Sequence, residues 1–284
     1  MLAILLALGS AVAYGAADFL AGWLSRRSDY ARVGLLSQLA AAAGSILVSA
    51  AVGGHPSGAS LWWGALSGLG GGLGTLALYR GLGRGRMNVV APLSGVLAAG
   101  LPALFGFVLG ERPAPGAMVG LVLALPAVWL TARAEETGEA AAGPSTGILD
   151  GVLAGLGFAV LFIGLQRGAR DGGLWPSAMS SVVSIVPMLG LYAFKAARDR
   201  GSTVAADAWA RHGPFVGGLL VGVAATCYFL ATQRGLLSVV AVLTSLYPAV
   251  TVALARWLLH ERIGRWQGVG LGLAGLSVVL ISAS

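Results

Sequence analysis

The chain has few charged residues, one cysteine and three histidines, and these shortages exclude several kinds of site. Only 10% of the 284 residues are Asp, Glu, Lys or Arg. The single cysteine, Cys227, excludes an internal disulfide and a metal cluster held by cysteines. The histidines, His55, His212 and His260, lie far apart along the chain. We therefore expect no metal site and no cofactor.

Signatures of catalysis and of phosphate binding are scarce as well. The sequence has no glycine-rich phosphate loop followed by lysine, so ATP is not expected to bind. It has no convincing Ser/His/Asp arrangement, so we do not predict an enzyme. The only lysine, Lys195, closes an apolar run, and the buried cations that would hold a phosphorylated substrate are missing.

Hydrophobic residues are correspondingly abundant. They make up 57% of the chain, and the mean hydropathy is +0.83. A soluble domain of this size has no interior large enough for so much apolar surface, which predicts an all-α polytopic membrane protein. The net charge of +7 comes from arginines in short loops, where they orient a protein in the bilayer rather than bind nucleic acid.

Ten apolar runs of roughly twenty residues predict ten transmembrane helices. They cover residues 2–24, 32–52, 61–82, 88–109, 115–132, 147–167, 175–195, 214–233, 239–259 and 265–282. No basic region precedes the first run, which we interpret as a mature helix rather than a cleaved signal. A polar segment, 133–146, is expected to link two halves of five helices each, 1–132 and 147–284.

The basic residues predict how these helices are oriented. Fourteen of the 18 lysines and arginines fall in loops that follow odd-numbered runs, and four fall in the other loops. The positive-inside rule then places the odd loops in the cytoplasm and both termini outside. Because each half has five spans, the two halves must insert with opposite orientation.

Sequence similarity between the halves supports this plan. At a constant offset of 150 residues, Val89-Val90-Ala91 recurs as Val239-Val240-Ala241 and Glu111-Arg112 recurs as Glu261-Arg262. Membrane proteins made of two such inverted halves are typically transporters, because halves that rock against each other provide alternating access.

Several motifs resemble the EamA domains of the drug/metabolite transporter superfamily. They are Tyr14-Gly15-Ala16-Ala17 in the first run, Asn88-Val89-Val90-Ala91-Pro92-Leu93 at the start of the fourth, and the two Glu-Arg pairs. Val242 stands where the second half would repeat Pro92. The resemblance covers nearly the whole chain and is similar in plan to bacterial amino acid exporters of the YddG type. It implies a central cavity surrounded by spans 1, 3, 4, 6, 8 and 9, in a bacterial inner membrane.

Asp18 is the foremost candidate for transport chemistry. We place it as the only acidic residue well inside a span, where a charge is expensive and usually functional. Tyr14 lies one helical turn earlier on the same face. Asp18 is either a proton-responsive or cation-binding group that couples transport, or a structural carboxylate near Arg26 and Arg27.

Further polar and aromatic residues inside the runs are candidates for binding substrate. They are Gln38, Tyr79, Ser94, Gln166, Trp175, Tyr228, Thr244 and Tyr247. Each is either a lining residue or one that packs at the bilayer interface or bonds a neighbouring helix. Pro92 and Pro248 are candidate gating positions, because proline bends a helix. We interpret the Glu-Arg pairs as helix caps, and the glycines Gly64, Gly68, Gly72, Gly218 and Gly222 as close helix packing rather than a hinge.

These observations predict a monomeric carrier that exports small organic metabolites, with neutral or aromatic amino acids as the preferred substrates. The lone carboxylate keeps a second interpretation open, the efflux of lipophilic cations or polyamines in exchange for protons. A membrane enzyme or a scaffold without transport activity are the alternatives of another class. The expected partners are a small-molecule substrate and the lipid bilayer.

Overall fold

The chain folds into a bundle of helices. The structure, a computed structural model, describes residues 1–25, 29–83, 87–132, 145–169, 173–198, 208–260 and 264–284, and no strand occurs among them. The helices are α1 (Leu2–Ser25), α2 (Tyr30–Val52), α3 (Gly58–Gly83), α4 (Met87–Val108), α5 (Pro115–Ala132), α6 (Ser145–Gly168), α7 (Trp175–Val183), α8 (Ile185–Arg198), α9 (Ala208–Thr232), α10 (Leu237–Thr244), α11 (Tyr247–Leu258) and α12 (Arg265–Ser282).

These helices form ten spans, as the apolar runs predict. α7 and α8 follow each other in one run, Trp175–Phe194, and α10 and α11 in another, Leu237–Leu258. Within the described residues, nine segments are long and apolar enough to cross a membrane. The tenth span is α3, whose 26 residues are long enough but include many glycines, which lower its hydropathy. The protein is therefore a multi-pass integral membrane protein.

Both broken spans lie in the second half, and each contains a proline four residues after the end of its first helix. Pro187 follows Val183, the last residue of α7, and Pro248 follows Thr244, the last residue of α10. Proline has no N–H to donate to the carbonyl four residues back, so the helical ladder is interrupted there. By contrast, α4 continues through both Pro92 and Pro102.

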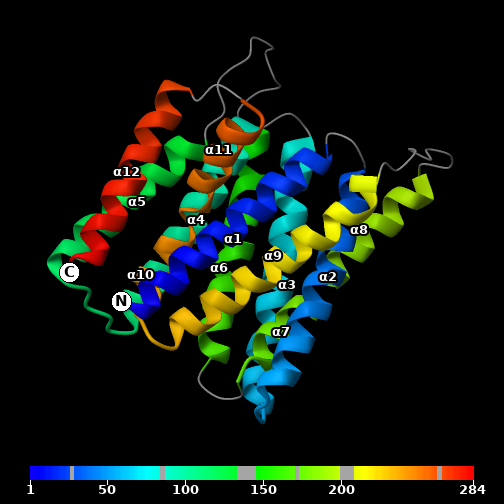
Figure 1. The fold of residues 1–284 in the computed structure, drawn as a ribbon, viewed down its shortest axis with the longest axis horizontal. Coiled ribbons are helices and arrows are strands. Elements are labelled where there is room, and N and C mark those ends of the chain that lie inside the picture. The colour runs from blue at the N-terminus through cyan, green and yellow to red at the C-terminus, as the bar shows by residue number, and fades with distance from the viewer. Residues whose placement is uncertain (26–28, 84–86, 133–144, 170–172, 199–207, 261–263) are drawn as a thin grey trace.

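The helices of one half pack against those of the other in equivalent pairs. α3 packs most extensively against α6, and its repeat counterpart α9 packs against α1. α5 and α12, the last spans of the two halves, pack against each other, as Figure 1 shows at one edge of the bundle. The two termini lie at the same end of the bundle, as expected for an even number of spans (Figure 1). We call this end the termini side and the opposite end the far side.

Glycines allow the closest of these contacts. A Cβ at Gly64 would overlap the backbone of Pro176, and one at Gly68 would overlap the carbonyl of Ser180, both in α7. In the other half, a Cβ at Gly218 of α9 would overlap the carbonyl of Ser37 in α2. The interpretation of these glycines as close helix packing is confirmed.

An ion pair joins the two halves at the far side. The guanidinium of Arg80, in the last turn of α3, contacts the carboxylate of Asp150 in α6, and its Nε donates to Oδ1 at 2.7 Å. Asp150 is 1% exposed. Asp150 is therefore a second acidic residue within a span, but it lies near the start of its run, whereas Asp18 was placed as the only one well inside a span.

Candidate functional site

A cavity of about 160 Å³ lies between the two halves. Its described lining comes from nine helices and one helix cap: Tyr14, Ala17, Asp18 and Ala21 of α1; Val33, Gly34, Ser37 and Gln38 of α2; Gly71, Thr75 and Leu78 of α3; Ala98 of α4; Phe158, Leu161 and Phe162 of α6; Ser180 and Ser181 of α7 with its C-cap Ser184; Met188 of α8; Gly217, Val221 and Ala225 of α9; and Tyr247 of α11. An engineered cavity of about 150 Å³ binds benzene, so this one accepts a small organic molecule.

One side of the cavity carries a carboxylate beside two tyrosines. Asp18 and Tyr14 project from α1, and the ring centroid of Tyr14 lies 6.3 Å from that of Tyr247 on α11. Gly15 permits this approach, because a Cβ there would come 2.7 Å from the carbonyl oxygen of Tyr247. Thr251 of α11 also donates to the carbonyl of Gly15 at 3.1 Å. The crossing of α1 and α11 therefore sets the position of both rings.

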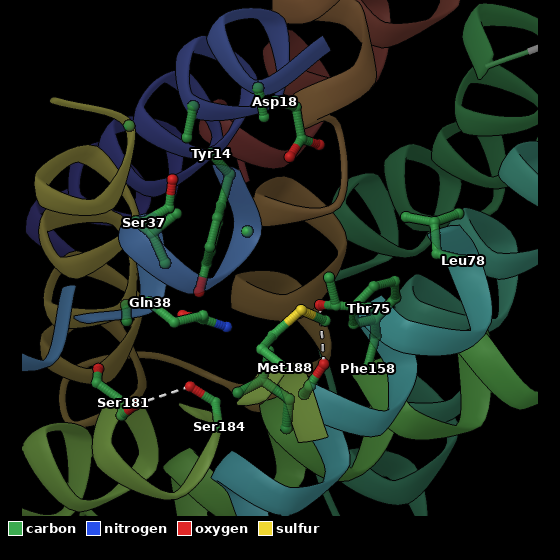
Figure 2. A pocket seen from close by; sticks show the side chains of 18 of the residues that line it. Tyr14, Asp18, Ser37, Gln38, Thr75, Leu78, Phe158, Ser181, Ser184 and Met188 are labelled. Carbon is green, nitrogen blue, oxygen red and sulfur yellow. Dashed lines mark hydrogen bonds between the residues drawn. The ribbon is translucent and has the colours of Figure 1, made fainter. Parts of the chain in front are cut away.

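Hydroxyl groups form much of the opposite side. Figure 2 shows Ser184 and Thr75 across the cavity from Asp18. Ser180, Ser181 and Ser184 come from α7 and its C-terminal cap, the segment that ends at the break before α8. Residues spaced three and four apart lie on one face of a helix, which is why these hydroxyls share a wall.

The described lining of the cavity carries a single charged side chain. Asp18 is the one charged side chain in the described lining, and it is exposed to the cavity. No hydrogen bond or ion pair joins it to another residue within the part of the chain that the structure describes. A carboxylate in this position needs a cation, a proton or water, because an uncompensated charge within a membrane is expensive.

The cavity reaches toward the far side of the bundle, and a buried aromatic pair lies at its termini side. It includes Asp18 and Ala21 in the second half of α1, and Gly34 near the start of α2. On the termini side, the fully buried ring of Tyr228 packs 4.7 Å from the ring of Phe162. The Tyr228 hydroxyl donates to the Phe162 carbonyl at 3.1 Å. We call this pair the aromatic pair.

The same two-half architecture is found in known proteins. The model of the EamA-like transporter family matches residues 145–283. The second half of the chain therefore carries an EamA-like domain. A solved crystal structure matches with a TM-score of 0.75 and 17% identity, over 99% of this chain and 96% of that one, which shows that the fold is shared. No curated protein sequence matches the chain significantly.

The match of the second half to this family supports a membrane transporter of small molecules. The structure brings four of the sequence-predicted site residues into the cavity lining: Tyr14, Asp18, Gln38 and Tyr247. The resemblance implied a cavity surrounded by spans 1, 3, 4, 6, 8 and 9. The second and seventh spans line it too, as α2 and as α7 and α8.

Other candidates lie away from the described lining of this transporter. The Tyr228 hydroxyl belongs to the aromatic pair, and the hydroxyls of Ser94 and Thr244 donate to the carbonyls of Ala91 and Ala7. Gln166 and Trp175 are also outside the lining. The side chain of Tyr79 is not among the described parts of the chain. Hydroxyls inside membrane helices tend to bond the nearest carbonyl, which explains why repeat symmetry alone did not place Ser94 and Thr244 in the cavity.

The prediction that the Glu-Arg pairs are helix caps is confirmed for Glu111, with one difference. Its carboxylate accepts the N–H groups of Leu237 and Ser238, at the start of α10, so it caps a helix of the opposite half. Glu261, its repeat counterpart, lies outside the described residues.

The two gating candidates differ in their helices. A break precedes Pro248, whereas α4 is continuous through Pro92.

Sequence reasoning missed the hydroxyl wall of α7. Its signal in the sequence is the series Ser177, Ser180, Ser181 and Ser184, in which the spacing of three, one and three keeps the hydroxyls on one helical face. Serine is common in membrane helices as a small packing residue, so this series did not stand out from the other serines.

Proposed function

We propose that this protein exports small organic amines, with Asp18 as the group that binds the protonated nitrogen. The carrying observation is the position of Asp18: it is the one charge in the described lining, it is exposed to the cavity, and no described residue pairs with it. A positively charged substrate would neutralise this carboxylate directly and form a charge-assisted hydrogen bond with it.

The surroundings of Asp18 support a cationic substrate that carries an apolar body. The faces of Tyr14 and Tyr247 attract a cation through the charge distribution of the aromatic ring. Phe158, Leu161 and Met188 add apolar surface to the same cavity. This combination favours an amine attached to a hydrocarbon chain or a ring.

The cavity supports amines better than the amino acids that the sequence resemblance implied. An amino acid also brings a carboxylate, and no cationic side chain occurs in the described lining.

The direction of transport is part of the proposal. If the arginine-rich loops are cytoplasmic, as in a bacterial inner membrane, the far side faces the cytoplasm and both termini face outward. In the proposed mechanism the cavity then receives substrate from the cytoplasm while the aromatic pair closes the termini side. Rocking of the two halves would separate this pair and close the far side, which amounts to export by alternating access.

Asp18 also offers a mechanism of coupling. One carboxylate holds either a proton or an ammonium group, so the two compete for the same site. A proton that binds from outside would displace the amine there and return with the empty carrier. Exchange of one amine for one proton follows from this competition.

The test compares two solutes that differ by one carboxylate. The purified full-length chain is placed in liposomes, and uptake of labelled phenethylamine is measured beside that of labelled phenylalanine, with and without a pH gradient. We expect transport of phenethylamine, driven by the gradient, and little of phenylalanine. Transport of phenylalanine alone would replace the proposal with amino acid export, and transport of neither would reject both.

A further inference from the structure

The hydroxyl groups opposite Asp18 offer acceptors rather than donors to a substrate. A hydroxyl has one proton and two lone pairs, so a hydroxyl that donates to a carbonyl has only lone pairs left. Thr75 donates to the carbonyl of Gly71 at 2.9 Å, and Ser184 donates to that of Ser181 at 2.8 Å. Both oxygens therefore face the cavity as acceptors only.

The hydroxyls of Ser180 and Ser181 also use their protons within the protein, so they too can only accept a hydrogen bond from a substrate. Ser67 donates to the carbonyl of Leu161 at 2.9 Å, so in its contact with Ser180, at 3.0 Å, the donor must be Ser180. Ser181 donates to the carbonyl of Ser177, so Ser45 is the donor in the contact between Ser45 and Ser181. We call the four oxygens of Thr75, Ser180, Ser181 and Ser184 the acceptor wall.

The groups able to donate lie elsewhere in the described lining. The amide of Gln38 and the hydroxyls of Ser37, Tyr14 and Tyr247 come from α1, α2 and α11, whereas the acceptor wall comes from α3, α7 and the cap that ends α7. A substrate group that reaches the acceptor wall finds oxygen lone pairs there. An N–H group is satisfied in that place, and a carboxylate or an ether oxygen is not.

We propose that the preferred substrates are small diamines, held at one nitrogen by Asp18 and at the other by the acceptor wall. This inference rests on the proposed function, because it assumes that an amine binds Asp18. The cavity volume of about 160 Å³ suits a short chain between the two nitrogens. Phe158 and Leu161 provide apolar surface for that chain, and Met188 also lines the cavity (Figure 2).

The test varies only the distal group of the substrate. Putrescine, butylamine and γ-aminobutyrate share a four-carbon chain with an amine at one end, and they carry an amine, a methyl group or a carboxylate at the other. Their transport by the full-length chain is measured in liposomes under the same gradient. We expect putrescine to exceed butylamine by about tenfold in transport efficiency, which corresponds to one or two hydrogen bonds. γ-Aminobutyrate should be transported least.

Two variants connect this preference to the acceptor wall. Thr75→Val combined with Ser184→Ala removes two of the four acceptors at nearly constant shape, and the ratio of putrescine to butylamine transport should fall severalfold. Ser94→Ala is the matched control, because Ser94 also donates to a carbonyl three residues back but lies outside the cavity. It should keep the wild-type ratio.

Each outcome separates the two proposals. Equal transport of putrescine and butylamine by the wild type would overturn the diamine inference and leave amine export standing. An unchanged ratio in the double variant would overturn the role of the acceptor wall. Transport of neither amine by the wild type would reject the proposed function itself. Because the wild-type ratio decides first, the result does not depend on whether the double variant folds.

Discussion

The backbone N–H of Leu237 donates to the carboxylate of Glu111 at 2.6 Å, although 126 residues separate the two in the sequence. Glu111 follows α4 in the first half, and Leu237 begins α10 in the second. Gly106 makes room for this carboxylate, because a Cβ at that position would collide with it. The contact lies on the termini side, which is closed in the proposed mechanism, and it joins the two halves there.

Replacement of Glu111 should therefore weaken the closed arrangement. In Glu111→Ala, two N–H groups at the start of α10 lose their acceptor, and the helix loses a favourable charge at its N-terminus. We expect a loss of about 1–2 kcal/mol in stability, measured by thermal unfolding in detergent. Arg112→Ala alters the adjacent, exposed residue and is the control. Equal stability of Glu111→Ala and Arg112→Ala would show that the contact contributes nothing.

Glycine packing leads to a second prediction. A Cβ at Gly68 would overlap the carbonyl of Ser180, so Gly68→Ala should force α3 and α7 apart and cost about 1–3 kcal/mol. Gly190→Ala is the matched control, because nothing lies within 4 Å of a Cβ at that position. Alanine is the better helix former, so Gly190→Ala should be neutral or stabilising. Thermal unfolding of both variants checks this, and a stable Gly68→Ala protein would contradict the close approach.

The sequence was sufficient to predict the ten spans and one side of the cavity, for a physical reason. Apolar length and loop charge act locally, so the runs are visible without knowledge of tertiary contacts. Asp18, Tyr14 and Tyr247 were candidates because polar groups are conspicuous in apolar runs, and all three line the cavity.

The features that the sequence did not predict depend on contacts between segments that are distant in the chain. Ser94 and Thr244 are repeat partners in the sequence, yet each donates to a nearby or neighbouring backbone carbonyl instead of lining the cavity. The breaks at Pro187 and Pro248 were equally hard to predict, because α4 remains continuous through its own Pro92. Whether a helix bends or breaks at a proline depends on the neighbours that satisfy the released carbonyl.

Asp18→Asn tests the coupling mechanism. Asparagine keeps the shape but neither ionises nor forms a charge-assisted bond, so amine transport should fall about tenfold or more. The residual transport should no longer respond to pH, because amine and proton no longer compete for one carboxylate. In the wild type, acid on the outer side should accelerate export.

Asp18→Glu is the control for this experiment, because it keeps the charge and should keep the response to pH. The measurement is amine flux from loaded liposomes over a range of external pH values. Normal pH-dependent flux in Asp18→Asn would remove Asp18 from the coupling mechanism and leave it as a structural group.

The break between α10 and α11 yields the last prediction. Pro248 cannot donate to the carbonyl of Thr244, so the two helices meet at a joint beside Tyr247, which lines the cavity. In Pro248→Ala, an N–H is restored and α10 can continue into α11. If the joint flexes as the halves rock, this variant should be more stable by about 1 kcal/mol and transport more slowly.

Pro92→Ala, in the continuous helix α4, should transport at the wild-type rate. Both rates are measured as amine flux in liposomes. A Pro248→Ala protein that transports at the wild-type rate would show that the joint is rigid and that the gate lies elsewhere.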